Sequence, residues 1–380
     1  EISECLVGSE MCIRDRKQLV LFLACAGTNQ VPVIVPADSK LEVTDPLFDT
    51  PVPERAVMAV MTSGTTGIPK ILFRSFESWA DFFAIQNAVF GVDADSRLFV
   101  QGSLAFTGNL NLYMGQLAAG GTLIAEDVFL PGKWEQVMAR ERANGIYLIP
   151  SKLLMLPRVF KGVNANIRTI ISGSQSLGRK DAEVLKKIFP NTEITLYYGA
   201  SELNYITYVK SADMTEERNL IGKPFPGVRV FIQDDEMYVD NAFHVENITV
   251  PYSLKDSGRM DLQGNFYFLG RTDDIVGVRG RKVSMMKIEN ALEEVAGITE
   301  AAVVLLPKEK DADMPAEIVS AFVTVEGTDV PENLRQQLKE KLADFEIPKR
   351  VIVLEAFPKN TSGKVDKARL KKMWIEQEPQ

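Results

Sequence analysis

Residues 61–70 (MTSGTTGIPK) combine hydroxyl-bearing residues, glycines and a lysine at a spacing that suits the binding of a phosphate group. Glycine lets the backbone bend so that successive N–H groups point into one concavity, which favours an anion. The hydroxyls add donors and the lysine adds a positive charge, so this segment would suit a polyphosphate such as ATP. A plain surface turn is the alternative interpretation. The candidate binding residues are Thr62, Ser63, Gly64, Thr65, Thr66, Gly67 and Lys70.

This segment differs from the two best-known nucleotide-binding patterns. A Gly-Lys-Ser/Thr triplet does not follow at the Walker A spacing, and no two glycines of the chain are separated by a single residue, as a dinucleotide fingerprint requires. The apolar run 56–60 directly before it predicts a buried strand that leads into a hairpin.

A second polar segment, residues 197–202 (YYGASE), follows an expected strand at 193–198. Ligands of α/β sheets collect where strands end. Tyr198 offers a ring on which adenine can stack. Glu202 offers carboxylate oxygens, which Mg²⁺ prefers together with phosphates and water. An ordinary turn between a strand and a loop is the alternative.

Composition and charge exclude several classes of protein. With 380 residues, 46% of them hydrophobic and 25% charged, the chain is typical of a soluble globular protein of two domains. A net charge of −8 argues against nucleic acid as the main partner. No apolar stretch is long enough for an integral membrane segment. The single histidine, His244, excludes Ser-His-Asp hydrolysis and multi-histidine metal chemistry, and we expect it to be structural.

The cysteines indicate the cellular compartment, and the N-terminal residues indicate where the folded domain begins. Cys5, Cys12 and Cys25 form no metal-binding spacing and favour a reducing, cytoplasmic location. Residues 1–16 have neither period nor caps and resemble translated adapter sequence, so we expect a non-native leader there.

The order of apolar segments predicts the fold class. Strands alternating with helices indicate a parallel sheet, a short-strand pattern after Gly222 indicates an antiparallel β subdomain, and residues from Asp273 onward indicate a smaller α+β unit. Ser75 is the expected N-cap of its helix. The expected helices are 17 onward, 75–90, 134–144, 153–160, 180–189, 287–295 and 331–345, and the expected strands are 31–36, 56–60, 122–125, 146–149, 167–171, 193–198, 301–306, 318–325 and 350–354.

Five segments, in this order, resemble the motifs of the adenylate-forming superfamily of acyl-CoA synthetases, peptide-synthetase adenylation domains and luciferase. Such concurrence is far more specific than one motif alone. The resemblance implies a large N-terminal AMP-binding domain of parallel sheets with helices (17–271), a smaller, mobile α+β C-terminal lid domain (272–380), and the cofactors ATP and Mg²⁺. The segments are 61–70, 197–202, 255–271 (KDSGRMDLQGNFYFLGR), 270–283 (GRTDDIVGVRGRKV) and 358–367 (PKNTSGKVDK).

The resemblance also implies residue roles. Lys364 would reach the carboxylate and the α-phosphate and stabilise charge in the transition state. Asp256 would accept hydrogen bonds from the ribose, although Leu254 and Lys255 stand where the family has Thr-Gly; Asp261 is the alternative. Thr66 and Glu202 would share in catalysis, with Glu202 as the metal ligand. Arg271 would pair with the ribose or the acyl-phosphate, Asp273 would be the hinge, and Ser174, Gln175, Gly199 and Ser201 would complete the nucleotide site.

Residues 103–110 (SLAFTGNL) align with the segment that bears the family's aromatic gate, and Phe106 takes that position. Gly108 and Gly173 are further expected pocket residues. Amino-acid-activating members usually place an aspartate beside the gate, whereas the neighbours here are Ala105 and Thr107. An uncharged pocket predicts a carboxylic acid without an α-amino group, either a fatty acid or an aryl acid.

The expected reaction has two steps. The acid attacks ATP to give acyl-AMP and pyrophosphate, and a thiol, expected to be that of CoA, then takes the acyl group as a thioester. We therefore expect an acyl-CoA synthetase of fatty acid metabolism. A ligase that loads an acyl carrier protein and a truncated ATP-binding pseudoenzyme are the alternatives. Acid identity and oligomeric state do not follow from the sequence.

Overall fold

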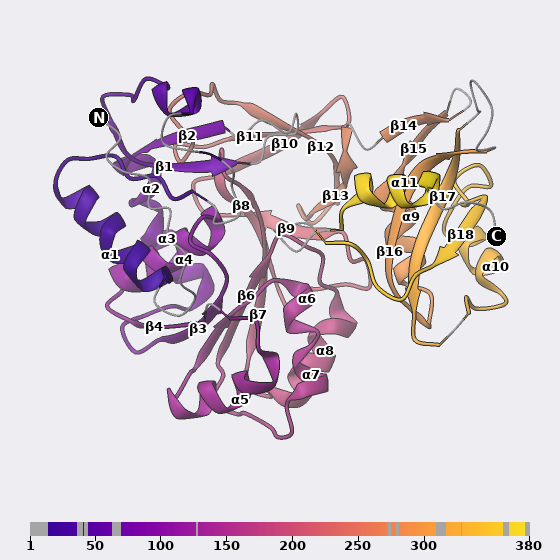
Figure 1. The fold of residues 1–380 in the computed structure, drawn as a ribbon, viewed down its shortest axis with the longest axis horizontal. Coiled ribbons are helices and arrows are strands. Elements are labelled where there is room, and N and C mark those ends of the chain that lie inside the picture. Colours follow the sequence, from indigo (N-terminus) through magenta and orange to yellow (C-terminus); the bar gives the residue numbers. More distant parts are fainter. Residues whose placement is uncertain are drawn as a thin grey trace. The chain divides into compact units, whose positions relative to one another are not determined.

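The computed structural model describes residues 14–35, 41, 45–62, 70–126, 128–272, 275–278, 281–308, 317–327, 329–359 and 365–376 (Figure 1). The chain divides into two compact units. The large unit comprises Glu1–Gln233, Met237–Leu254 and Met260–Tyr267. The small unit comprises Asp234–Glu236, Lys255–Arg259 and Phe268–Gln380. The domain boundary predicted between residues 271 and 272 stays a prediction.

The described residues of the chain form one eleven-stranded sheet, in the order β10-β11-β12-β13-β9-β8-β7-β6-β5-β3-β4. Strands β4, β3, β5, β6 and β7 are parallel, and β8 and β9 follow β7 antiparallel, so the predicted parallel sheet is confirmed. The strands are β3 (Arg97–Gln101), β4 (Thr122–Glu126), β5 (Gly145–Tyr147), β6 (Thr169–Gly173), β7 (Glu193–Ala200), β8 (Asn204–Lys210), β9 (Leu220–Pro224), β10 (Arg229–Gln233), β11 (Glu236–Asp240), β12 (Tyr252–Met260) and β13 (Phe266–Arg271).

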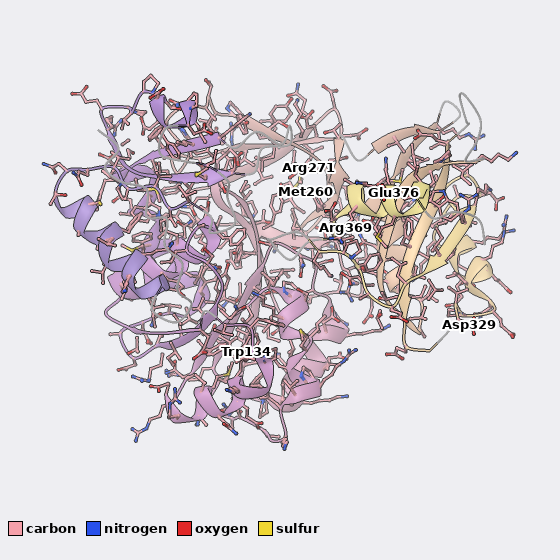
Figure 2. All side chains as sticks on the ribbon, in the orientation of Figure 1. Trp134, Met260, Arg271, Asp329, Arg369 and Glu376 are labelled. Atoms are coloured by element: carbon pink, nitrogen blue, oxygen red, sulfur yellow. The ribbon has the colours of Figure 1, made fainter. Side chains whose placement is uncertain are left out.

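Helices cover the parallel strands because these strands bury both faces, as the fully buried β6 illustrates. Trp134 of α5 (Figure 2) is completely buried. It packs against Phe99 of β3, with ring centroids 5.6 Å apart. The helices of the large unit are α1 (Arg14–Gly27), α2 (Phe76–Trp79), α3 (Phe82–Phe90), α4 (Thr107–Ala118), α5 (Pro131–Arg140), α6 (Pro150–Leu153), α7 (Leu156–Val159) and α8 (Arg179–Ile188), with a 3₁₀ turn at Pro46–Asp49.

A separate hairpin precedes this sheet in the chain. It consists of β1 (Ala56–Thr62) and β2 (Lys70–Ser75), which pair antiparallel with Thr62 opposite Lys70. Ser75 then caps α2, since its side chain accepts a hydrogen bond from the Ser78 N–H, as predicted.

Several elements differ from their predicted extent. The helix expected at 75–90 is divided into α2 and α3, and the helix expected at 153–160 into α6 and α7. Pro157 explains the second division, because it has no N–H to donate to Leu153 and so cannot continue that helix. The strand expected at 31–36 contains one isolated bridge, between Val33 and Ala59. The helical segment Arg14–Gly27 includes the last residues of the predicted leader.

The small unit has the predicted α+β character. In its three-stranded sheet β16 (Ile298–Pro307) and β17 (Glu317–Val325) are antiparallel, whereas β17 and β18 (Arg350–Val353) are parallel. Alternate residues of β16 face two separate hydrophobic clusters, Ala301 and Val303 on one side and Ala302 and Val304 on the other. The remaining elements are β14 (Ile275–Val278), β15 (Arg281–Ser284), α9 (Met285–Glu293), α10 (Leu334–Lys339), which is shorter than the helix expected at 331–345, and α11 (Lys367–Glu376).

Candidate functional site

The carboxyl ends of parallel strands β3, β5, β6 and β7 meet at one edge of the large unit's sheet, the usual place for a ligand. At this edge Gln175 accepts a hydrogen bond from the Ser151 N–H (3.0 Å), which joins the chain segments that follow β6 and β5. Ser174, between Gly173 and Gln175, is exposed and has a left-handed φ of 69°. Two predicted nucleotide-site residues, Ser174 and Gln175, therefore lie at the expected edge.

The end of β7 is linked to the start of α4. The hydroxyl oxygens of Ser201 and Thr107 are 2.8 Å apart. Phe106, the residue before α4, is exposed over 43% of its surface. The structure therefore brings the predicted aromatic gate next to the segment predicted to hold adenine and metal. In that segment Tyr198, Ser201 and Glu202 are half-buried and Gly199 is exposed.

Arg74 of β2 is a functional candidate that sequence reasoning missed. Its guanidinium is completely buried and donates to the carbonyl oxygens of Ser78 (3.1 Å), Phe243 (2.9 Å) and Ser201 (2.7 Å). Burial lowers the pKa of Arg74 to about 10, while the negative charge of Glu202 acts in the opposite direction. Arg74 therefore remains a cation at neutral pH.

Arg74 connects strand β2 to the turn that follows β7. It lies on the strand that begins at Lys70, directly after the predicted phosphate segment, and it anchors this strand to the turn at Ser201 and Glu202. Main-chain bonds strengthen the same region, since Val245 N–H donates to Glu202 and Glu246 N–H donates to Phe73 (both 2.9 Å). The sequence feature that could have indicated Arg74 is its position as a charged residue inside the otherwise apolar strand KILFRS.

The two predicted pocket glycines face tyrosine side chains. A Cβ atom at Gly108 would lie 2.7 Å from the Tyr197 hydroxyl and 2.9 Å from the Tyr147 hydroxyl. A Cβ atom at Gly173 would lie 2.4 Å from the Tyr197 ring. The hydroxyls of Tyr147 and Tyr197 are hydrogen-bonded at 2.8 Å, and burial raises the pKa of Tyr147 to about 12. This part of the site is therefore aromatic and uncharged at neutral pH.

In the small unit, Arg271 (Figure 2) lies at the end of β13. Its Nε donates to the Asp256 carboxylate at 3.3 Å. Asp256 is only 5% exposed. Lys255 beside it has a φ of 63°, a conformation that glycine adopts readily, at the position where the resembling family has glycine. Asp261, the alternative ribose ligand, instead accepts hydrogen bonds from Asn265, which are the main cause of its lowered pKa.

We expect the substitution Asp256→Asn to weaken ATP binding about tenfold or more, because a hydrogen bond to a charged group contributes about 1.5–3 kcal/mol. The measurement is the Kd for ATP by calorimetry together with the KM for ATP. Asp261→Asn is the matched control, since its carboxylate is engaged within its own turn. An Asp261→Asn variant with the larger loss of affinity would reassign the ribose contact to Asp261.

Several residues predicted for the site lie outside the described residues. For two of the segments that contain them, 61–70 and 358–367, the structure describes the residues on either side. Thr62 pairs with Lys70 across the first segment. Across segment 358–367, Lys359 forms an isolated β-bridge with Val365. In the same segment the Asp366 N–H donates to the Pro358 carbonyl (2.8 Å). The residues outside are Ser63, Gly64, Thr65, Thr66, Gly67, Asp273 and Lys364.

Across the described ranges, no three His, Cys, Asp or Glu residues are grouped closely enough to hold a metal ion. Among the described residues, Glu202 therefore does not belong to such a group of three. No described helix combines the length and the apolar character needed to cross a bilayer.

Comparison with known proteins agrees with these observations. The model of the AMP-binding enzyme family matches residues 13–242, and the model of the AMP-binding enzyme C-terminal domain matches residues 287–364. The uncharacterized acyl-CoA ligase YhfT of Bacillus subtilis (strain 168) is 27% identical over 376 residues, which cover 93% of this chain and 76% of that protein.

Two further similarities concern a ligase and a solved structure. The putative long chain fatty acid-CoA ligase VraA of Staphylococcus haemolyticus is 24% identical, over 83% of this chain and 70% of that protein. The structure of O-succinylbenzoate coenzyme A synthetase (MenE) from Bacillus subtilis in complex with ATP and magnesium ion shares the fold, with a TM-score of 0.73 and 18% identity. The similarity covers 93% of this chain and 82% of that one.

Proposed function

The chain belongs to the AMP-binding enzyme family of adenylate-forming ligases, and on this premise we propose that it activates a non-amino carboxylic acid and transfers the acyl group to CoA. The observation that carries the proposal is the bond from Arg74 to the Ser201 carbonyl. It ties the hairpin predicted to hold the phosphates to the turn predicted to hold adenine and metal. The proposed compartment is the cytoplasm, on the strength of the cysteine pattern.

The proposed chemistry needs no nucleophile from the protein. An oxygen of the substrate carboxylate attacks the α-phosphorus of ATP, the bond to the leaving pyrophosphate breaks, and acyl-AMP forms. The sulfur of CoA then attacks the acyl carbon, its proton is lost, and AMP leaves. The protein positions the reactants in line and offsets phosphate charge.

The proposed residue roles follow from the motif resemblance, and the contacts of the described residues support them. Residues 62–70 bind the phosphates, and Lys364 stabilises charge on the α-phosphate and the carboxylate. Glu202 would hold Mg²⁺, which would neutralise charge on the phosphates; a single carboxylate fits this ion, because Mg²⁺ completes its shell with phosphate oxygens and water. Asp256 holds the ribose, and Phe106 closes the acid pocket.

ATP–pyrophosphate exchange with the purified chain tests the function over a panel of fatty, aryl and amino acids. We expect exchange with at least one non-amino acid, none without acid, and acyl-CoA formation once CoA is added. Faster exchange with amino acids would contradict the uncharged-pocket argument. Binding of ATP without AMP formation from any acid would instead support the pseudoenzyme, and thioester formation only on a phosphopantetheine-bearing carrier protein would replace CoA as acceptor.

A further inference from the structure

Three buried tyrosines, Tyr147 of β5, Tyr197 of β7 and Tyr205 of β8, form what we call the tyrosine wall. Their side chains are 2–7% exposed. Tyr147 and Tyr197 share a hydrogen bond, and the rings of Tyr197 and Tyr205 meet edge to face with centroids 4.6 Å apart. The Tyr205 hydroxyl donates to the Gly108 carbonyl at 3.4 Å. The wall is therefore one connected body rather than three separate side chains.

The tyrosine wall lies against the two glycines that are predicted to line the acid pocket, Gly108 and Gly173. The missing side chains of Gly108 and Gly173 would both collide with it, at distances of 2.4–2.9 Å. A group that extended from these glycines in the direction of the missing side chains would meet the same atoms. In that direction an acyl chain would stop at the glycine surface.

The space behind the tyrosine wall is filled as well. Tyr197 and Tyr205 pack on Phe90, with centroids 5.9 and 5.3 Å away, and Tyr205 also stacks on Phe225 at 5.7 Å. Phe90 and Phe225 are almost completely buried. A small rotation of one tyrosine would not open a tunnel, because the next layer is aromatic core at close-packed distances.

A polar network closes the space between α4 and β8. Asn111 of α4 donates from Nδ2 to the side-chain oxygen of Asn204 (2.8 Å) and accepts from the Trp79 indole N–H (2.8 Å). Gln86 donates to the Asn111 carbonyl at 3.1 Å. Shifting these buried groups to admit a chain would break several hydrogen bonds that nothing apolar can replace.

We propose that the acid is a short-chain acid with an uncharged tail, on the order of two to four carbon atoms, and that Tyr197 sets this limit. The inference rests on the proposed function and narrows its substrate class from fatty or aryl acids. The groups of the tyrosine wall and of the Asn111–Asn204 network are phenols and amides, which offer no cation for a second carboxylate.

The test compares acetate, propionate, butyrate, hexanoate, decanoate and benzoate in ATP–pyrophosphate exchange. With the unaltered chain we expect the highest kcat/KM among the acids of two to four carbons and at least a tenfold lower value for hexanoate. In Tyr197→Ala the ratio of hexanoate to propionate should rise at least tenfold, because one methylene in a pocket changes selectivity about 10- to 200-fold. Tyr238→Ala on β11 is the matched control and should leave the ratio unchanged.

The outcomes separate the inference from the proposed function. Exchange that is fastest with hexanoate, decanoate or benzoate in the unaltered chain would overturn the inference and leave the ligase function intact. No exchange with any acid would contradict the function and the inference with it. If Tyr197→Ala does not fold, the chain-length profile of the unaltered protein still decides the length limit.

Discussion

Replacing Arg74 by methionine is expected to lower the free energy of unfolding by about 3–5 kcal/mol, because each buried carbonyl oxygen that loses its donor costs about 1–3 kcal/mol. Methionine fills a similar space but leaves the carbonyl oxygens of Ser78, Phe243 and Ser201 without their donor. The measurement is urea-induced unfolding followed by fluorescence and circular dichroism. Arg74→Lys should recover only part of the loss, because an ammonium group cannot reproduce the planar guanidinium fork.

Arg229→Met is the matched control for Arg74→Met. Arg229 lies on β10 of the same unit, its side chain is 69% exposed, and its pairing with Asp240 is at the surface. Its replacement should cost less than about 1 kcal/mol. If Arg74→Met also lowered the free energy of unfolding by less than about 1 kcal/mol, Arg74 would not anchor the β1–β2 hairpin. The ATP affinity of Arg74→Met should fall with stability, since the Ser201–Glu202 turn loses its support.

Replacing Lys364 by alanine is expected to lower the rate of adenylation at least 100-fold while ATP affinity changes little. The reason is that its proposed interaction is made with charge that develops in the transition state, and losing one such group typically costs 10²–10³ in kcat. Single-turnover formation of acyl-AMP measures the first quantity, and calorimetry measures the second.

The surroundings of Lys364 provide the control. Lys371 lies on α11 seven residues later and is exposed, so Lys371→Ala makes the same change of charge without touching the proposed chemistry. Lys367, by contrast, forms an ion pair with Glu289 of α9 (2.7 Å) that fixes the start of α11, and it is unsuitable as a neutral control. Equal rates for Lys364→Ala and Lys371→Ala would remove Lys364 from the mechanism.

Periodicity in the sequence predicted the parallel strands β4, β5, β6 and β7 and most helices, because these depend on local patterns of apolar residues. It missed the parallel strand β3 (Arg97–Gln101) and the helix α4 (Thr107–Ala118). The N-cap at Ser75 was equally readable, since a cap is made within three residues. The breaks within helices were missed where a proline or a short loop interrupts a continuous apolar stripe, as between α6 and α7. Local patterns therefore give the type of an element better than its length.

The contacts that complete the candidate site could not be predicted in the same way. Arg74 reaches carbonyls 127 and 169 residues away in the chain, and Tyr147 meets Tyr197 across 50 residues. No local pattern encodes such partners, because they are fixed by the order of strands in the sheet. The motif resemblance supplied Gly108 and Gly173 but not the tyrosines that stand against them.

The antiparallel return of β8 beside β7 has a consequence for how such proteins could diverge or be engineered. Residues 197–205 form one uninterrupted peptide that contains Tyr198 and Glu202, proposed for the nucleotide, together with Tyr197 and Tyr205, proposed to limit the acid. Exchanging these nine consecutive residues between homologues would therefore change the nucleotide contacts and the chain-length preference together.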